Sequence, residues 1–429
     1  MIGYRKIPQH IHEAIGRGWV VVLMTAALSF TFVPAGDARS RDVKTVKHGA
    51  GQWELLVDGK PYFIKGVVYN FWAIGDDHNT GTLRDWSILD TDKNGRVDVA
   101  YDSWVDKNGN NIQDADEPAV GDWQLLKEMG ANTIRVYQMP SADARIAPLY
   151  IDQGQRLTFV HPPNKELFRD LYARYGIMTM VGHFFGEWTI GSGAKWEQGA
   201  DFTDPRQRKN LLEGIRVMVE EHKDEPYTLM WVIGNENFNP FDQDNAEKQV
   251  EAYLTLVNEA AKLIHRLDPH HPVALCNLAD RNIEQMRKYC PAVDIFGMNA
   301  YSRRFEPVWK KARLYFDRPV MLTEYGLPAI LDGKENGMVQ ARYHQEAWAD
   351  IVDNKYGGTG VGNSIGGALF VWCDQWALAG SPWQHDSGEW MGVPGVEWFG
   401  VTSQGDGSKS PFMRQLREAY FFYQKEWKE

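Results

Sequence analysis

Eight short apolar runs, separated by polar or amphipathic sequence, limit what this chain can fold into. The runs are residues 63–69, 133–137, 177–181, 227–233, 273–276, 293–298, 320–323 and 368–372. Helical periodicity is found at 122–129, 165–175, 207–222, 246–266 and near 412–425. Continuous apolar strands joined by helices are typical of parallel sheets buried on both faces. We therefore expect an α/β fold, and eight such units favour a closed (β/α)8 TIM barrel.

The alternative is an open, doubly wound sheet, which usually has a glycine-rich turn after its first strand. Here Asn70-Phe71-Trp72 follows the first strand instead. A short β-hairpin around Asp58-Gly59, within residues 52–62, is expected before the barrel. We find no low-complexity linker in residues 39–429 and expect them to form a single domain.

Residues 1–38 have the pattern of a secretory signal peptide. Three basic residues precede an uncharged, mostly apolar run from Trp19 to Val33, and small residues follow Pro34. We expect a cleaved signal and a secreted or periplasmic protein without a stable membrane span. An uncleaved N-terminal membrane anchor is the alternative.

Composition narrows the range of functions. The chain has 429 residues, a net charge of −11 and 43% hydrophobic residues, which excludes a disordered or collagen-like protein. The acidic balance argues against a nucleic-acid partner. The three cysteines, Cys276, Cys290 and Cys373, show no zinc-binding spacing, and we expect buried thiols. The sequence leaves the oligomeric state open.

An insertion at about residues 78–120 is strongly acidic. Between Asp90 and Glu117, eight acidic and three basic residues give a net charge of −5 in 28 residues. Carboxylates this dense repel one another unless a cation lies among them. Because the insertion follows the first strand, we expect it to shape one wall of a cleft.

Two stretches of the insertion have oxygen-bearing side chains at the spacing of an EF-hand calcium loop. The first offers Asp90, Asp92, Asn94 and Asp98 but has no carboxylate at position 12. The second offers Asp106, Asn108, Asn110, the carbonyl group of Ile112, Asp114 and Glu117. We expect both to bind structural Ca²⁺; a solvated acidic loop is the alternative.

Polar residues stand where the predicted strands end, which is where barrel enzymes carry their active sites. Glu236 follows the fourth strand in Gly234-Asn235-Glu236, and Glu324 ends the seventh. Other strand ends present Arg135, His183, Tyr301 and Trp372. Two carboxylates across a barrel mouth suit glycoside cleavage, in which one gives a proton and the other attacks the anomeric carbon.

These strand ends resemble the motifs of clan A glycoside hydrolases, which are retaining enzymes on (β/α)8 barrels. Gly234-Asn235-Glu236 is similar to the acid/base motif, and Thr323-Glu324-Tyr325-Gly326 to the nucleophile motif. Asn299-x-Tyr301 resembles the catalytic domain of β-galactosidases and β-glucuronidases. Residues 63–66 and 132–137 are closer to fungal β-1,3-glucanosyltransferases, although those are rich in cysteine and this chain is not.

The resemblance implies a role for each residue. Glu324 would be the nucleophile, kept ionised by Tyr301 and Arg135, and Glu236 the general acid/base. Asn235 would bind the sugar 2-hydroxyl, His183 another hydroxyl, and Trp372 would form the floor of the sugar subsite.

The implied protein is a secreted retaining β-glycoside hydrolase that acts on oligo- or polysaccharides and needs no catalytic cofactor. A β-glucanosyltransferase, which passes the glycosyl group to a sugar hydroxyl, and a non-catalytic carbohydrate-binding barrel are the alternatives.

Overall fold

The computed structural model describes residues 40–77, 80–150, 159–239, 245–390 and 392–428. The signal peptide predicted at residues 1–38 lies outside this part of the chain. Within the described residues, no helix combines the length and the apolar character that a membrane crossing requires.

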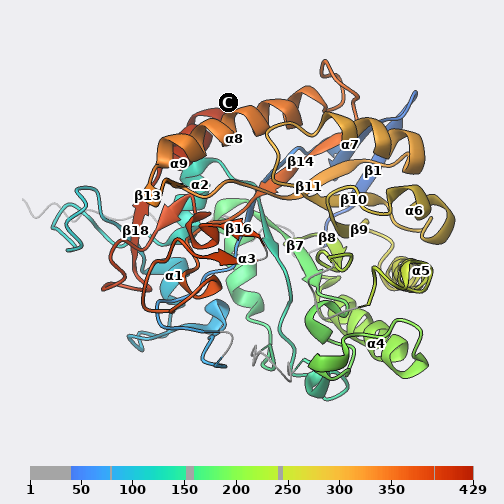
Figure 1. Ribbon diagram of the computed structural model, residues 1–429, viewed down its shortest axis with the longest axis horizontal. Helices are drawn as coiled ribbons and strands as arrows, with labels where there is room; N and C mark the ends of the chain where they lie inside the picture. The colour runs from blue at the N-terminus through green and yellow to red at the C-terminus, as the bar shows by residue number, and fades with distance from the viewer. Residues whose placement is uncertain (1–39, 78–79, 151–158, 240–244, 391, 429) are drawn as a thin grey trace, which may run out of the picture. The chain divides into compact units, whose positions relative to one another are not determined.

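Eight parallel strands form a closed barrel, so the predicted TIM barrel is confirmed (Figure 1). They are β4 (Ile64–Val68), β6 (Thr133–Val136), β7 (Met178–His183), β8 (Thr228–Ile233), β9 (Val273–Leu278), β10 (Ile295–Asn299), β11 (Val320–Tyr325) and β14 (Ser364–Leu369). Neighbouring strands follow one another in chain order, and β14 pairs with β4 to close the barrel.

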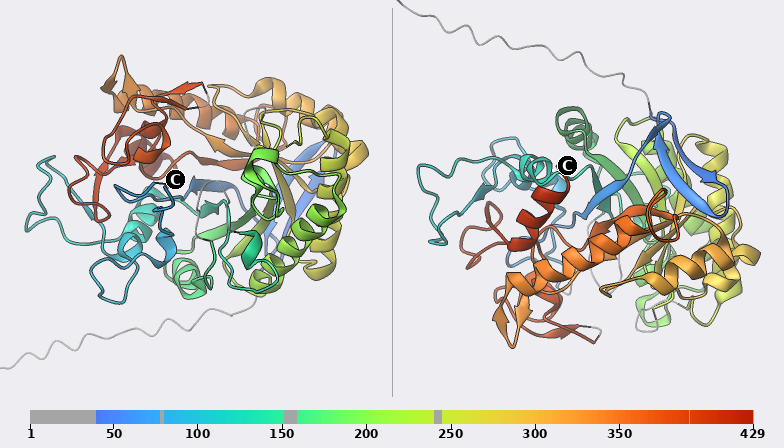
Figure 2. Two further views of the ribbon diagram at one scale, coloured as in Figure 1. Left: turned by 60° about the horizontal axis from the view of Figure 1, so that its bottom comes forward. Right: turned by 90° about the horizontal axis from the view of Figure 1, so that it is seen from above.

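Helices cover the outside of the barrel (Figures 1 and 2). They are α2 (Asp122–Met129), α3 (Lys165–Tyr175), α4 (Pro205–His222), α5 (Val250–Leu267), α6 (Ile283–Tyr289), α7 (Glu306–Lys311), α8 (Gly337–Asp353) and α9 (Glu418–Glu426). Local sequence sets their limits. The Asn164 side chain caps the start of α3, and Gly176 ends that helix in the left-handed region.

Two apolar layers hold the barrel together. Side chains such as Met180, Met230 and Met321 fill its interior, whereas residues of α5, including Leu254 and Ile264, pack in the layer between strands and helices. Each strand is thus buried on both sides, which explains its continuous apolar sequence.

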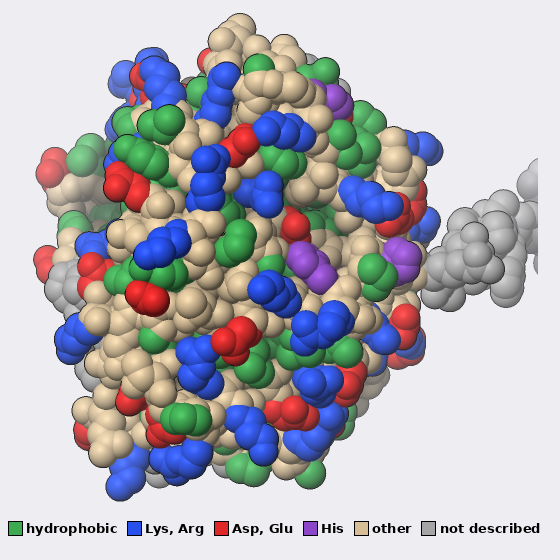
Figure 3. All heavy atoms as spheres, turned by 90° about the vertical axis from the view of Figure 1, so that its right-hand side faces the viewer, with side chains coloured by type: hydrophobic (Ala, Val, Ile, Leu, Met, Phe, Trp, Pro, Cys, Tyr) green, Lys and Arg blue, Asp and Glu red, His purple; other side chains and the backbone are tan. Residues whose placement is uncertain are grey.

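On the outer face over α5 and α6, positive and negative side chains intermingle and apolar ones are scattered (Figure 3).

The eighth strand and the last helix differ from the prediction. The strand was expected at 368–372, but β14 begins at Ser364 and ends at Leu369. Two glycines, Gly366 and Gly367, weaken its sequence signal, yet the barrel requires them. A Cβ atom at Gly366 would lie 2.2 Å from the carbonyl oxygen of Ile64 in β4. The helix predicted near 412–425 is instead a short strand followed by α9.

Short elements complete the chain. The strands are β1 (Val43–His48), β2 (Gln52–Val57), β3 (Lys60–Pro61), β5 (Trp104–Val105), β12 (Ile330–Leu331), β13 (Lys334–Glu335), β15 (Glu389–Trp390), β16 (Val393–Pro394), β17 (Thr402–Ser403) and β18 (Met413–Leu416). The short helices are α1 (Asp98–Tyr101), η1 (Trp86–Ile88), η2 (Ala147–Leu149), η3 (Glu187–Thr189), η4 (Trp196–Gln198), η5 (Ala312–Phe316), η6 (Trp376–Leu378) and η7 (Val396–Trp398). Strands β1, β2 and β3 form an antiparallel sheet, with Asp58 and Gly59 between β2 and β3.

The acidic insertion is attached to the C-terminal segment. Its strand β5 pairs with β18, and β18 pairs with β17. Next to this sheet, the buried guanidinium group of Arg414 donates two hydrogen bonds of 2.9 Å to the carboxylate of Asp122, the first residue of α2. The insertion is therefore part of the folded body and adjoins the barrel mouth.

Candidate active site

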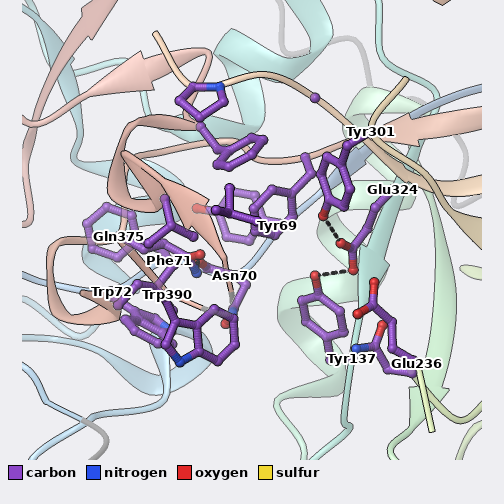
Figure 4. A pocket seen from close by; sticks show the side chains of 18 of the residues that line it. Tyr69, Asn70, Phe71, Trp72, Tyr137, Glu236, Tyr301, Glu324, Gln375 and Trp390 are labelled. Carbon is purple, nitrogen blue, oxygen red and sulfur yellow. Dashed lines mark hydrogen bonds between the residues drawn. The ribbon is translucent and has the colours of Figure 1, made fainter. Parts of the chain in front are cut away.

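A cleft of about 860 Å³ opens at the C-terminal ends of the barrel strands. Residues from all eight strand ends line it: Tyr69, Tyr137, Phe184, Glu236, Leu278, Tyr301, Glu324 and Phe370. The side chains of Glu236 and Glu324 point into the same space, and Trp72 and Trp390 lie on the opposite side of the pocket (Figure 4). The structure thus brings the two predicted carboxylates together.

Three donors hold the carboxylate of Glu324. The Arg135 guanidinium donates from Nη1 to Oε1 at 2.8 Å, and the Tyr137 hydroxyl donates to the same oxygen at 2.6 Å. The Tyr301 hydroxyl donates to Oε2. The Arg135 and Glu324 side chains are only 1% and 5% exposed, so the ion pair is almost completely removed from water. These charge-assisted hydrogen bonds fix the Glu324 carboxylate in place.

The two tyrosines remain protonated donors. Desolvation of each hydroxyl raises the pKa of Tyr137 and Tyr301 well above the usual value, and the nearby Glu324 carboxylate raises it further. Both hydroxyl groups therefore stay neutral and act as hydrogen-bond donors to Glu324.

Glu236 is presented by an unusual turn after β8. Its φ is +56°, in the left-handed region that residues other than glycine rarely adopt, and Gly234 two residues earlier has φ +70°. The Asn299 amide donates to Glu236 Oε1 at 2.8 Å. Backbone strain of this kind persists where surrounding contacts enforce it, and it is frequent at functional sites.

An amide network beneath the two carboxylates connects the ends of β6, β8 and β10 with η3. Asn235 accepts from Arg135 Nη2 at 2.7 Å and from the Asn299 amide at 3.1 Å, and its own amide donates to Glu187 at 3.1 Å. The pairing of β10 with β11 shifts register at Asn299, which pairs with Glu324. Such irregularities re-aim side chains next to active sites.

Of the predicted site residues, Arg135, Asn235, Glu236, Tyr301 and Glu324 come together. Arg135 and Tyr301 contact Glu324 as expected. Asn235 lines the cleft beside Glu236, and its role toward a sugar hydroxyl stays a prediction.

The expectation for His183 is not met. Met178 and Met180 of β7 fill the barrel interior, so the alternating direction of side chains turns His183 outward, against Gly214 of α4. Its Nδ1 accepts from the backbone N–H of Phe185, and burial lowers its pKa to about 3. His183 is a neutral packing residue.

Trp372 does not form the floor of the cleft either. It is 1% exposed and packs between Tyr69 and Tyr420, because the strand that was expected to end there ends three residues earlier. Phe370 lines the cleft in its place.

Sequence reasoning gave no role in the site to Tyr137, to Glu187 or to Asn299, although Asn299 belongs to the Asn299-x-Tyr301 motif. The first had a signal, since Tyr137 is two residues after Arg135 on one strand and so shares its face. Asn299 stands two residues before Tyr301 in the same way. Glu187 lies on η3, in the loop after β7, and no local pattern marks it.

All three cysteines are free and buried, as expected. Cys276 lies under the site, where the Arg135 guanidinium approaches its sulfur at 3.2 Å. Burial raises the pKa of its thiol to about 11, so Cys276 is a neutral neighbour of the ion pair.

The predicted calcium ligands lie in the insertion, apart from the two catalytic candidates. Carboxylate oxygens of Asp90, Asp92 and Asp98 converge. Asn94 lies in the same loop, and the members of the second set, Asp106, Asn108, Asn110, Ile112, Asp114 and Glu117, form a separate turn.

Comparisons with known proteins agree with this geometry. Residues 156–352, slightly less than half of the chain, match the family model "Glycosyl hydrolases family 2, TIM barrel domain". A search of curated proteins finds no match.

Among solved structures, the β-D-glucuronidase of Dictyoglomus thermophilum is similar with a TM-score of 0.54 and 16% identity, over 91% of this chain and 54% of that one. The β-galacturonidase of Eisenbergiella tayi bound to galacturonate gives 0.52 and 18%, over 90% and 54%. The β-glucuronidase of Bifidobacterium dentium in complex with coumarin-3-O-glucuronide gives 0.54 and 18%, over 90% and 49%.

This chain therefore spans about half the length of these relatives. In sequence over residues 156–352, and in fold over most of its length, the chain is similar to the TIM barrel domain of glycosyl hydrolases family 2, as its clan A motifs indicated.

Proposed function

We propose that this protein is a secreted, retaining β-glycoside hydrolase that cleaves β-linked oligo- or polysaccharides by double displacement. The observation that carries the proposal is the pair of carboxylates in one cleft with different surroundings. Glu324 is held by a cation and two hydroxyl donors, whereas Glu236 accepts from the Asn299 amide. Such a difference separates a nucleophile from an acid.

In the first step, Glu236 gives its proton to the glycosidic oxygen, and the bond from that oxygen to the anomeric carbon breaks. Glu324 forms a bond to the anomeric carbon from the opposite face, and the alcohol leaves. Arg135, Tyr137 and Tyr301 orient the attacking carboxylate before the reaction, so little reorganisation is needed.

In the second step, Glu236 takes a proton from water, and the oxygen of that water attacks the anomeric carbon. The ester bond to Glu324 breaks, and its carboxylate returns to the same three donors. Two inversions at the carbon give net retention. No step needs a metal ion.

A polymeric substrate is supported by a row of aromatic rings that leads away from Glu324. The rings of Tyr137 and Phe184 stack at 5.8 Å, and those of Phe184 and Trp188 at 5.9 Å. Trp390 follows edge-on at 6.3 Å from Trp188. We call these four residues the aromatic wall. It offers apolar surface to sugar rings beyond the one that reacts.

The proposed place of action rests on the sequence of residues 1–38. N-terminal sequencing of the protein isolated from its source tests it, since a cleaved signal predicts a chain that begins near residue 39. Retention of residues 1–38 would favour a membrane anchor.

A product assay tests the activity. The protein is incubated with a panel of β-linked oligosaccharides and aryl β-glycosides, including β-glucuronides, and the first product is observed by NMR. We expect the β-anomer to form first and the substrate to become shorter. An α-anomer as first product would rule out retention, products longer than the substrate would indicate the transferase, and no turnover would favour a binding protein.

The role of Glu236 predicts a dependence on the leaving group. Glu236→Ala should lower kcat on natural glycans by about 10²–10⁴-fold, the usual contribution of a general acid. It should spare the first step on aryl glycosides with good leaving groups, which do not need the proton. Equal losses on both substrate types would show that Glu236 is not the acid.

A further inference from the structure

The acidic insertion carries two loops that the proposed reaction does not use. We call residues 90–98 the first loop and residues 106–117 the second loop. Both have backbone N–H groups that bond to side-chain oxygens, as compact polar turns do. The two loops differ in whether every buried carboxylate oxygen has a hydrogen-bond donor.

In the first loop, three carboxylates converge without a cation from the chain between them. One oxygen each from Asp90, Asp92 and Asp98 lies within 4.8 Å of the other two. No other group of three His, Cys, Asp or Glu side chains in the described part of the chain meets this condition. Negative charges at such separations repel one another strongly unless a cation screens them.

The surroundings of Asp98 are a second, independent indication of a metal site in the first loop. It is completely buried, and its Oδ2 accepts hydrogen bonds from the backbone N–H and the hydroxyl of Thr91, at 2.8 and 2.6 Å. Its Oδ1 has no hydrogen-bond partner. A carboxylate oxygen that is buried without a hydrogen-bond partner is costly, and such an atom requires an explanation.

In the second loop, the chain's own donors occupy the carboxylates. Asp106 accepts from three backbone N–H groups and from the Gln415 amide at 2.9 Å. Glu117 accepts from the N–H groups of Lys107 and Asp114, at 2.7 and 3.0 Å. Backbone N–H groups and the Gln415 amide therefore occupy the carboxylates of Asp106 and Glu117, and the predicted Ca²⁺ site there stays a prediction.

We propose that the first loop binds one Ca²⁺ ion through the carboxylates of Asp90, Asp92 and Asp98. Oxygen ligands from a flexible loop suit Ca²⁺, which accepts six to eight of them at varied angles. Asn94 is not counted among these ligands, because its amide donates to Asp92 at 3.1 Å and its oxygen accepts from the Arg96 N–H at 2.8 Å. Mg²⁺ fits less well because it demands near-octahedral geometry and keeps its water.

The ion would support one wall of the cleft. The backbone N–H of Asp98 donates to the carbonyl oxygen of Leu89 at 2.8 Å, which closes the first loop onto the end of η1. Trp86 and Ser87 of η1 line the cleft. Calcium binding thus fixes the segment that carries these residues, and it acts on stability before it acts on turnover.

Binding of the metal alone tests the proposal. The protein is treated with EDTA, freed of the chelator, and titrated with CaCl₂ in a calorimeter, with MgCl₂ as the comparison. The wild type should bind Ca²⁺ more tightly than Mg²⁺, and saturating Ca²⁺ should raise Tm by about 5 °C, because a ligand that binds only the folded state stabilises it.

Variants locate the ion. Asp98→Asn should lose one bound Ca²⁺ per chain. Asp92→Asn, which alters an exposed residue and so spares the fold, should lose the same ion and most of the Tm shift. Asp116→Asn removes an equal charge from an exposed residue of the same insertion and should keep both. The proposal is overturned if the wild type binds no Ca²⁺, if Asp92→Asn binds as much as the wild type, or if Asp116→Asn loses as much.

Discussion

The catalytic centre and the first loop both gather negative charge, and they handle it in opposite ways. At the barrel mouth, Glu324 has a guanidinium group at 2.8 Å and two hydroxyl donors. In the first loop, Asp90 and Asp92 have backbone N–H donors, and Asp98 keeps one buried oxygen without a hydrogen bond. The chain supplies its own cation at one site and not at the other.

This difference separates chemistry from structural support. A carboxylate that is paired with a side-chain cation keeps its position and still presents an oxygen to a substrate. Carboxylates that converge on each other offer the oxygen ligands that Ca²⁺ prefers, which is the basis of the proposal for the first loop. The local charge balance therefore underlies both proposals, a reacting carboxylate at the barrel mouth and a metal site in the first loop.

The largest expected effect comes from removing the reacting carboxylate. Glu324→Ala should lower kcat by more than about 10⁴-fold, because it removes the nucleophile as well as its fixed charge. Added azide should restore part of the activity and give a product of inverted configuration, since the small anion attacks from the vacated side. Near-normal turnover of Glu324→Ala would contradict the assignment, and the calcium-dependent Tm shift should survive this substitution.

The next prediction removes the guanidinium group of Arg135 and keeps the carboxylate of Glu324. Arg135→Met should lower the free energy of unfolding by about 3–5 kcal/mol, as expected when a buried charge loses its partner. The double variant Arg135→Met/Glu324→Gln should recover much of this loss, because the uncompensated charge is gone. Denaturant unfolding of the wild type, both single variants and the double variant measures the coupling. Additive effects would show that the ion pair does not stabilise the centre.

The sequence predicts the barrel well because its evidence is local. A strand buried on both sides is a run of apolar residues, and a functional residue at its end interrupts that run, as Glu236 and Glu324 do. The prediction of β14 failed at Gly366, whose role depends on the backbone of β4 across the barrel. Contacts between distant parts of the chain leave little trace in local sequence.

For the same reason, the sequence predicted only some of the residues that form the site. Strand ends identify which residues reach the mouth, but side-chain direction decides which ones enter it. Counting alternate residues from Met178 and Met180 in β7 turns His183 outward, and the same count places Tyr137 beside Arg135. Only the folded chain brings Asn299 to Glu236, 63 residues apart in sequence.

The aromatic wall predicts a smaller effect that depends on substrate length. Trp188→Ala should lower kcat/KM on long oligosaccharides by about 10-fold, mainly through KM, because a stacked aromatic ring contributes about 1 kcal/mol beyond its buried area. Activity on an aryl monosaccharide should stay near that of the wild type. Trp383→Ala, which alters a 70% exposed ring that does not line the cleft, is the matched control. Equal losses on short and long substrates would contradict subsites along the wall.

Glu397 of η7 shows a third way to bury a carboxylate. It is completely buried and accepts from the N–H groups of Ala379 and Asp386, at 3.1 and 2.7 Å. The charged groups that act on it include the like charges of Asp386 and Asp374. Desolvation, aided by these neighbours and opposed by the N–H donors, raises the pKa of Glu397 to about 8. We therefore expect a proton, and not a cation, to compensate this carboxylate.

The pH dependence of stability tests this third case and carries the smallest expected effect. A carboxyl group with a pKa near 4.3 in the unfolded chain and near 8 in the folded protein binds its proton more tightly when folded. Its contribution to stability is complete below about pH 4.3 and is lost as the pH rises toward 8. Glu397→Gln stays neutral and loses this dependence. We therefore expect the wild-type Tm minus the variant Tm to fall by a few degrees between pH 5 and pH 8, and to level off above. A difference that stays constant over this range would show that Glu397 is ionised in the folded protein, and the contrast with Glu324 would then depend on hydrogen bonds rather than on charge.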